Sequence, residues 1–63
     1  MTRAPETMEE LSSGAKVSHD KFGIGIILKR TGPHNNPKLH VQFDKWGKRT
    51  LLARMANLEL VIT

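Results

Sequence analysis

The residues best suited to chemistry in this 63-residue chain are basic and aromatic, and they gather in two places. The first group surrounds a predicted tight turn at Trp46-Gly47 and comprises Lys45, Trp46, Lys48 and Arg49. The second, smaller group comprises His19, Lys21 and Phe22. Aromatic side chains beside Arg or Lys are typical anchors of protein interfaces, so both groups are candidate partner-binding residues. The alternatives are a structural role for Trp46, covering the open end of a barrel, and a merely solvated face for Lys48 and Arg49.

A catalytic site is not expected. The acids available after residue 13 are Asp20, Asp44 and Glu59, and the chain has no Gly-x-Ser-x-Gly elbow, Walker sequence or His-Glu-x-x-His pair. A chain this short also has little room for the water-excluding pocket that tunes catalytic pKa values. We therefore expect no enzymatic activity and no cofactor.

Metal, phosphate and methyl-lysine sites have equally little support. There is no cysteine, and His34 and His40 are separated by a predicted loop, outside the compact spacings of structural zinc sites. We interpret His34 as a solvated loop residue and His40 as an outward-facing strand residue. The glycines of Gly23-Ile24-Gly25 precede β-branched residues rather than a helix, which favours a positive φ or a bulge over a phosphate cradle. Three aromatic residues are too few for a cage around a methylated lysine once Phe43 is buried.

Length and composition favour one small cytoplasmic domain. A folded chain of this size buries only about 60% of the surface that its unfolded form exposes, so one modest core is expected. The absence of cysteine fits a reducing compartment. The longest apolar run, Ile26-Ile27-Leu28, is far shorter than the roughly 20 residues that span a bilayer, and the acidic first residues do not form a signal peptide. We expect a monomer that does not bind membranes.

Charge divides the chain at residue 14. Residues 1–13 carry a net charge of −2 and residues 14–63 carry +6, which together give the net charge of +4 for the whole chain. We predict that residues 1–13 form a flexible acidic tether, in which Thr7 and Glu10 have the spacing of a capping box for a short helical turn. Residues 14–63 then form the folded domain, whose positive charge suits an acidic protein surface or a phosphate backbone.

Periodicity predicts five short strands within residues 14–63. The clearest is the alternation of Leu39, Val41 and Phe43 with polar residues, and its partner is the segment 24–30 across the turn-rich loop 32–37. Which of Ile26 and Ile27 faces inward stays open. Further strands are expected at 15–19, 48–52 and 58–62, with one helical turn over 53–57. This order describes an all-β, five-stranded SH3-like barrel with one short helical turn before the last strand. Its predicted core includes Leu51, Leu52, Met55, Leu58 and Leu60.

Two blocks of this sequence resemble a known family. Residues 19–25 have the pattern His-x-Lys-aromatic-Gly-x-Gly, and residues 49–59 have the pattern basic-x-Leu-Leu-Ala-x-x-Ala-x-Leu-Glu at barrel spacing. Over residues 14–61 the chain resembles the carboxy-terminal Tudor-like domain of bacterial UvrD/PcrA DNA helicases. The resemblance fits such a helicase domain and equally a short standalone bacterial protein with the same barrel.

This resemblance implies a Tudor-like barrel, flexibly linked to a superfamily 1 helicase motor, that couples the motor to RNA polymerase during transcription-linked repair. In that family a basic residue just before the Leu-Leu strand contacts the polymerase, and the matching position here is Arg49, preceded by Lys48. The family usually has lysine there, so Arg49 keeps the charge with a different geometry. Met55 replaces a usual aromatic and is compatible with a core role. The residues themselves leave open an alternative, a barrel that binds DNA or RNA phosphates without reading sequence.

Overall fold

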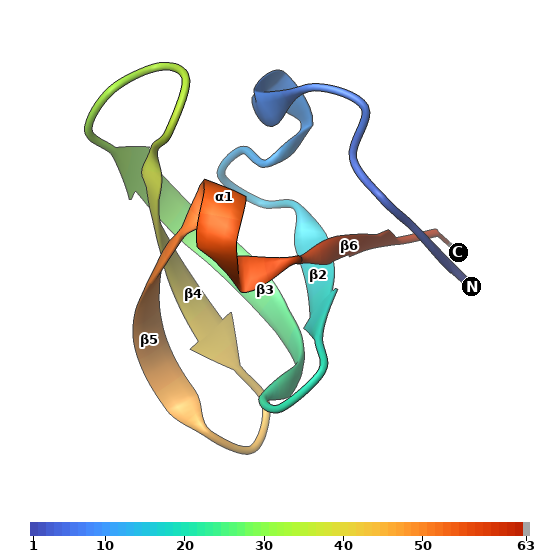
Figure 1. Ribbon diagram of the computed structural model, residues 1–63. Coiled ribbons are helices and arrows are strands. Elements are labelled where there is room, and N and C mark those ends of the chain that lie inside the picture. Colours follow the sequence, from blue (N-terminus) through green and yellow to red (C-terminus); the bar gives the residue numbers. More distant parts are fainter. Residues whose placement is uncertain (63) are drawn as a thin grey trace.

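Alternating apolar residues build an antiparallel sheet that curls into a small barrel (Figure 1). The computed structural model describes residues 1–62. In chain order the elements are β1 (Thr2–Arg3), the 3₁₀ helix η1 (Met8–Glu10), β2 (Lys16–His19), β3 (Gly23–Thr31), β4 (Lys38–Phe43), β5 (Gly47–Leu52), α1 (Ala53–Ala56) and β6 (Glu59–Val61). The strands lie in the order β1-β6-β2-β3-β4-β5. The predicted all-β, barrel-like fold with a helical turn before the last strand is confirmed, although β1 adds a strand and the sheet does not close.

The hydrophobic core lies on the concave side of the curled sheet. Leu39, Val41 and Phe43 are fully buried, as the alternation in β4 predicted. In β3, Ile27 is 1% exposed and Ile26 is 45% exposed, so Ile27 is the inward-facing residue of the pair. The core cluster is completed by Leu11, Val17, Ala53 and Leu58, which come from four other segments.

The two glycines at the start of β3 have different physical roles. Gly23 has a φ of +80°, which is the left-handed conformation predicted for the turn from β2 into β3. Gly25 instead lies where β3 passes over Phe43, because a Cβ atom at Gly25 would be 2.7 Å from the Cδ1 atom of that ring. The bulge in β3 lies further along, between residues 27 and 29. Close packing, rather than a positive φ or a bulge, therefore requires Gly25.

The predicted core was wrong for two residues of the carboxy-terminal half. Leu58 is buried, and Leu51 and Leu60 pack against the core from half-buried positions. Leu52 and Met55, in contrast, are 39% and 76% exposed. Leu52 follows Leu51 in β5, and neighbouring residues in a strand point to opposite faces. Met55 is exposed because α1 is a single turn that buries only its first residue.

The first 13 residues, predicted as a flexible tether, pack against the barrel along part of their length. β1 pairs with β6, and Leu11 is 1% exposed within the core cluster. The Arg30 guanidinium donates a hydrogen bond to the carbonyl oxygen of Met8 at 2.7 Å. The core therefore begins before residue 14. The predicted boundary was placed from net charge, and net charge does not reveal that a single leucine is buried.

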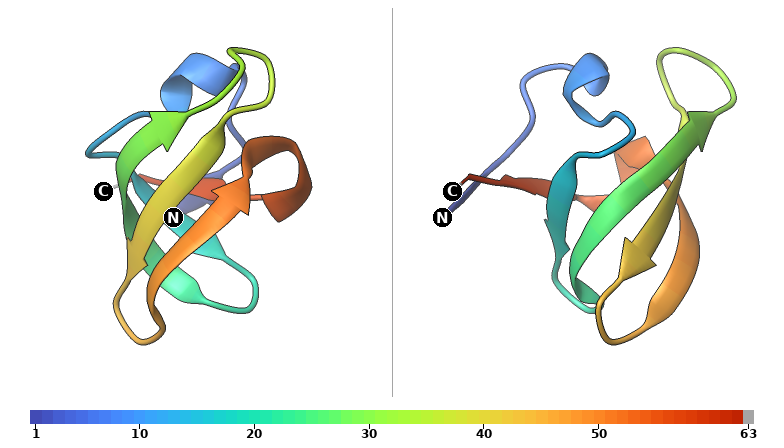
Figure 2. Two further views of the ribbon diagram at one scale, coloured as in Figure 1. Left: turned by 90° about the vertical axis from the view of Figure 1, so that its left-hand side faces the viewer. Right: turned by 180° about the vertical axis from the view of Figure 1, so that it is seen from behind.

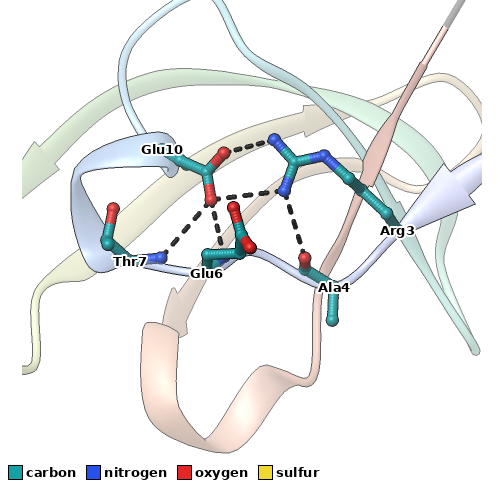
Figure 3. Close-up of polar contacts among 5 residues, drawn as sticks. All are labelled: Arg3, Ala4, Glu6, Thr7 and Glu10. Atoms are coloured by element: carbon teal, nitrogen blue, oxygen red, sulfur yellow. Dashed lines mark hydrogen bonds and ion pairs between the residues drawn. The ribbon is translucent and has the colours of Figure 1, made fainter.

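The Glu10 carboxylate organises the short turn in this amino-terminal segment (Figure 3). It accepts hydrogen bonds from the Arg3 guanidinium and from the backbone N–H groups of Glu6, at 2.6 Å, and Thr7, at 3.3 Å. The bond from Thr7 is the backbone half of the predicted capping box. Chiefly through the bond from Arg3, these contacts lower the pKa of Glu10 from 4.5 to about 2. The carboxylate therefore stays ionised at pH values where an ordinary glutamate is protonated.

We predict that Leu11→Ala lowers the free energy of unfolding by about 2–5 kcal/mol, because it leaves a cavity in the core. Urea unfolding followed by circular dichroism measures this change. The matched control is Leu28→Ala, which removes the same atoms from a side chain that is 44% exposed and should cost less than about 1 kcal/mol. Equal, small effects of both substitutions would show that the amino-terminal segment does not contribute to the core.

Candidate partner-binding site

Two turns meet at one end of the barrel and bring the two predicted groups of residues together. The β2–β3 turn carries Phe22 and the β4–β5 turn carries Trp46, and both turns lie at the lower end of the molecule in Figures 1 and 2. The centroids of these two rings are 5.5 Å apart. We name the resulting surface the aromatic cluster, which consists of His19, Lys21, Phe22, Trp46 and Arg49.

Arg49 lies over the rings of Phe22 and Trp46 in the aromatic cluster. Its Cζ atom is 5.7 Å from the centroid of Phe22 and 5.9 Å from that of Trp46, within the range of a cation–π interaction. The position of Arg49 follows from strand register. In β5, Arg49 pairs with the buried Val41 of β4, so its side chain points to the concave side of the sheet. The guanidinium is held there by a 2.8 Å hydrogen bond that it donates to the carbonyl oxygen of Lys48.

The Lys48 side chain points to the other face of the sheet. It pairs with Gln42, whose side chain lies on the outer, convex face. Lys45 is exposed in the β4–β5 turn, where it lines a small hollow together with Phe22. The structure thus places Trp46 and Arg49 in the aromatic cluster, Lys45 at its margin and Lys48 on the convex face.

His19 connects the aromatic cluster to the core. Its Nδ1 atom accepts hydrogen bonds from the backbone N–H groups of Lys21, at 3.0 Å, and Phe22, at 3.2 Å. A neutral ring that accepts at Nδ1 carries its proton on Nε2. The same ring stacks on Phe22 at 4.7 Å and meets the buried Phe43 edge-on at 6.1 Å. His19 is therefore a satisfied histidine at the barrel edge that also forms a wall of the cluster.

The structural role considered for Trp46, which was to cover the open end of the barrel, belongs to Phe22. Phe22 is half-buried, and its ring centroid is 5.2 Å from that of Phe43, so it covers the core at this end of the barrel. Trp46 packs on the outside of Phe22 and remains 46% exposed. About half of the Trp46 side chain is thus available for contact with another molecule.

The convex face of the sheet carries a second concentration of positive charge. Register places Lys16, Ile26, Gln42 and Lys48 in one row across four strands. The next rows place Lys29 and Lys38 on the same face, and none of β2, β3, β4 and β5 contains an acidic residue. We name this surface the lysine face, consisting of Lys16, Lys29, Lys38 and Lys48. Net charge alone did not separate it from the aromatic cluster, because the separation depends on register and on the bulge in β3.

The remaining histidines lie where the sequence suggested. The imidazole of His40, which lies on the convex face, is within hydrogen-bond distance of the hydroxyls of Thr31, at 3.2 Å, and Thr50, at 3.3 Å. His34 is exposed in the β3–β4 loop, with its Nε2 atom 2.7 Å from a carboxylate oxygen of Glu9. Among residues 1–62, no three His, Asp or Glu side chains come together as metal ligands would. No helix in the same range has the length and apolar content needed to cross a bilayer.

We predict that His19→Ala lowers the free energy of unfolding by about 1–2 kcal/mol, because two backbone N–H groups lose their acceptor. His19→Asn should recover part of this loss, since the Asn amide oxygen occupies the same place along the side chain as Nδ1 and accepts from backbone N–H groups two or three residues on. Thermal or urea unfolding of the three proteins measures the effect. An Asn variant as unstable as the Ala variant would indicate that ring stacking, rather than hydrogen bonding, is the main contribution of His19.

Comparison with known proteins finds a family that matches the part of the chain that forms this site. The sequence model of the PcrA/UvrD tudor domain matches residues 13–59, a range that contains the whole aromatic cluster. The chain is 40% identical over 52 residues to DNA helicase II of Haemophilus influenzae, which covers 82% of this chain and 7% of the helicase. It is 38% identical over 50 residues to the ATP-dependent DNA helicase PcrA of Leuconostoc citreum, which covers 79% of this chain and again 7% of the helicase. The chain thus spans only a small part of the length of these relatives. The predicted resemblance is confirmed, and the chain belongs to the PcrA/UvrD tudor domain family.

Proposed function

We propose that this domain docks a DNA helicase or repair factor onto RNA polymerase through the aromatic cluster. The observation that carries the proposal is the position of Arg49 over Phe22 and Trp46 at an exposed end of the barrel. A cation orients an approaching acidic surface, and exposed aromatic rings provide the apolar contact area that gives such a contact its strength.

The charge of Arg49 is available to a partner. Among residues 1–62, the ion pairs are those of Arg3 with Glu10 and of His34 with Glu9, so no carboxylate in this range pairs with Arg49. The segment 45–58 that contains it has no acidic residue. An acidic patch on the partner would therefore pair with Arg49 without displacing an internal ion pair.

Family membership supports the non-catalytic part of this proposal. Tudor domains of this type are small accessory parts of DNA helicases, and the matched segment is 7% of each relative. Coupling to RNA polymerase is the role that the matching basic position suggests for Arg49.

We predict that Arg49→Glu weakens binding to purified, nuclease-treated bacterial RNA polymerase by more than about tenfold, because one favourable charge contact becomes repulsive. Biolayer interferometry with the immobilised domain measures the affinity. Lys38→Glu, with the same change in net charge on the lysine face, is the matched control and should bind almost as tightly as the wild type. Arg49→Lys should retain most of the affinity. Equal affinities of wild type and Arg49→Glu would refute docking through this residue.

A second candidate function, binding of nucleic acid, is favoured by the lysine face. Its four ammonium groups project from one convex surface without neighbouring carboxylates in β2–β5. Lysine contacts to phosphates position a protein on a duplex without reading its sequence. No Phe, Tyr or Trp lies in the rows that form this face, and the imidazole of His40 lies between the hydroxyls of Thr31 and Thr50. Contacts to a phosphate backbone are therefore favoured over stacking with single-stranded bases.

If the lysine face binds duplex DNA through its four lysines, the logarithm of the binding constant should fall against the logarithm of salt concentration with a slope of about −3.6. The double variant Lys16→Gln with Lys48→Gln should reduce this slope by about 1.8. Fluorescence anisotropy with a labelled duplex measures both values. The control is Lys21→Gln with Lys45→Gln, which removes the same charge from the β2–β3 and β4–β5 turns and leaves the lysine face intact. Identical slopes for the two double variants would exclude the lysine face as the DNA contact.

A further inference from the structure

β5 is the last strand of the sheet, and one of its edges is free. Within residues 1–62, no strand pairs with the side of β5 that faces away from β4. The Ala53 N–H, which follows β5, donates to the carbonyl oxygen of Pro37 on the β4 side, at 3.0 Å. Backbone groups of successive residues in a strand point alternately to its two sides. The N–H groups of Lys48, Thr50 and Leu52 therefore point to the free edge, as does the carbonyl group of Thr50. The Lys48 carbonyl already accepts from the Arg49 guanidinium, and the carbonyl of Leu52, the N-cap residue of α1, accepts the first hydrogen bond of that helix.

A groove of about 330 Å³ lies beside this edge, lined by His19, Thr50, Leu51, Leu52, Met55 and Ala56. Met55 and Leu52, the two residues that the sequence wrongly placed in the core, are 76% and 39% exposed. Single exposed apolar residues are common on protein surfaces. Here, however, two of them flank the same groove next to unpaired backbone groups, which is the arrangement that binds an extended peptide.

Charge around the groove selects the kind of peptide. The segment 45–58 carries four cations and no acidic residue, the cations being Lys45, Lys48, Arg49 and Arg54. The charged groups that this segment offers to a peptide in the groove are therefore all positive. A second copy of β5 would instead bring its own lysine and arginine to the same edge, and facing like charges disfavour such pairing.

We propose that an extended, acidic segment of the docking partner adds to the free edge of β5 as a further strand. The inference rests on the proposed docking function for the identity of the partner, and it specifies how that partner is recognised. Main-chain hydrogen bonds with the N–H groups of Lys48, Thr50 and Leu52 and with the Thr50 carbonyl supply affinity, and alternate side chains supply specificity.

The register of β5 specifies the sequence of the added strand. The residue opposite Arg49 faces the concave side and should be acidic. The residue opposite Lys48 faces the convex side and should also be acidic. The residue opposite Leu51 lies over the groove beside Met55 and should be apolar. The partner segment therefore has the order acid, acid, any residue, apolar, in one chain direction or the other.

The test begins with a displayed library of random ten-residue peptides, selected on the full chain. The expected result is enrichment of the acid-acid-x-apolar order in either direction. A synthetic copy of an enriched peptide should slow hydrogen exchange, followed by NMR, at the amides of Lys48, Thr50 and Leu52, which point to the free edge. The amides of Arg49 and Leu51, which already face β4, should change little. Absence of this order among the selected peptides, or unchanged exchange at the three edge amides, would overturn the proposal.

Matched substitutions separate the backbone contacts from side-chain effects. Thr50→Pro removes one edge-facing N–H group and should weaken peptide binding by about tenfold, whereas Thr50→Ala keeps the N–H group and should bind almost as well as the wild type. Because proline can disturb folding, a second pair tests the groove: Met55→Asp should weaken binding and Met55→Leu should not. Wild-type affinity in both Thr50→Pro and Met55→Asp would contradict strand addition.

The same variants distinguish this inference from the proposed function. If RNA polymerase binding is lost in Arg49→Glu but retained in Thr50→Pro and Met55→Asp, docking stands and strand addition is overturned. If the wild type binds the selected peptides at the free edge but does not bind polymerase, strand addition stands and the proposed partner is wrong.

Discussion

The close passage of β3 over Phe43 is the constraint on which the rest of the structure depends. Phe43 is fully buried and occupies the space that a side chain at position 25 would need. The same ring also lies against His19 and Phe22, at centroid distances of 6.1 Å and 5.2 Å. The aromatic cluster is therefore built directly on a core residue, and its place at one end of the barrel follows from the packing at Gly25.

From this core residue a series of mutually tilted rings extends to the solvent. Phe43 is buried, Phe22 is half-buried and Trp46 is about half exposed, with Arg49 across the outer two. Each ring is fixed by the one beneath it, and His19 ties the first turn to the core through two backbone hydrogen bonds. A surface arranged in this way loses little conformational freedom when a partner binds, which favours affinity.

Much of this arrangement was predictable from the sequence, because the apolar residues that alternate along β4 are the residues whose side chains are buried. Leu39, Val41 and Phe43 face the core as their alternation requires, and the strand, loop and helical-turn positions follow from turn residues and apolar runs. The sequence predicted Phe22 and Trp46 only as members of two separate groups. Their contact at one end of the barrel depends on two turns that are far apart in sequence and adjacent in space.

The unpredicted features depend on register and on isolated side chains. Adjacent basic residues, Lys48 and Arg49, serve opposite faces because Arg49 pairs with an inward residue of β4. Composition cannot reveal that pairing. Met55 is exposed because α1 is only one turn long, and Leu11 joins the core although its neighbours are acidic. In each case the composition of the surrounding segment did not reveal where one particular side chain lies.

Because of where the chain ends lie, the resistance of the barrel to a pulling force depends on the direction of the pull. β1 and β6 place the ends side by side, and the Ile62 N–H donates to the Met1 carbonyl oxygen at 2.7 Å (Figure 1). A pull that separates the two ends would peel this two-residue pairing bond by bond and leave the core untouched. A pull between β5 and the amino-terminal end must instead act on the six-residue pairing of β4 with β5 and on the core side chains beneath it. The domain is thus compliant between its own two ends and stiffer between a molecule held at β5 and the amino-terminal end.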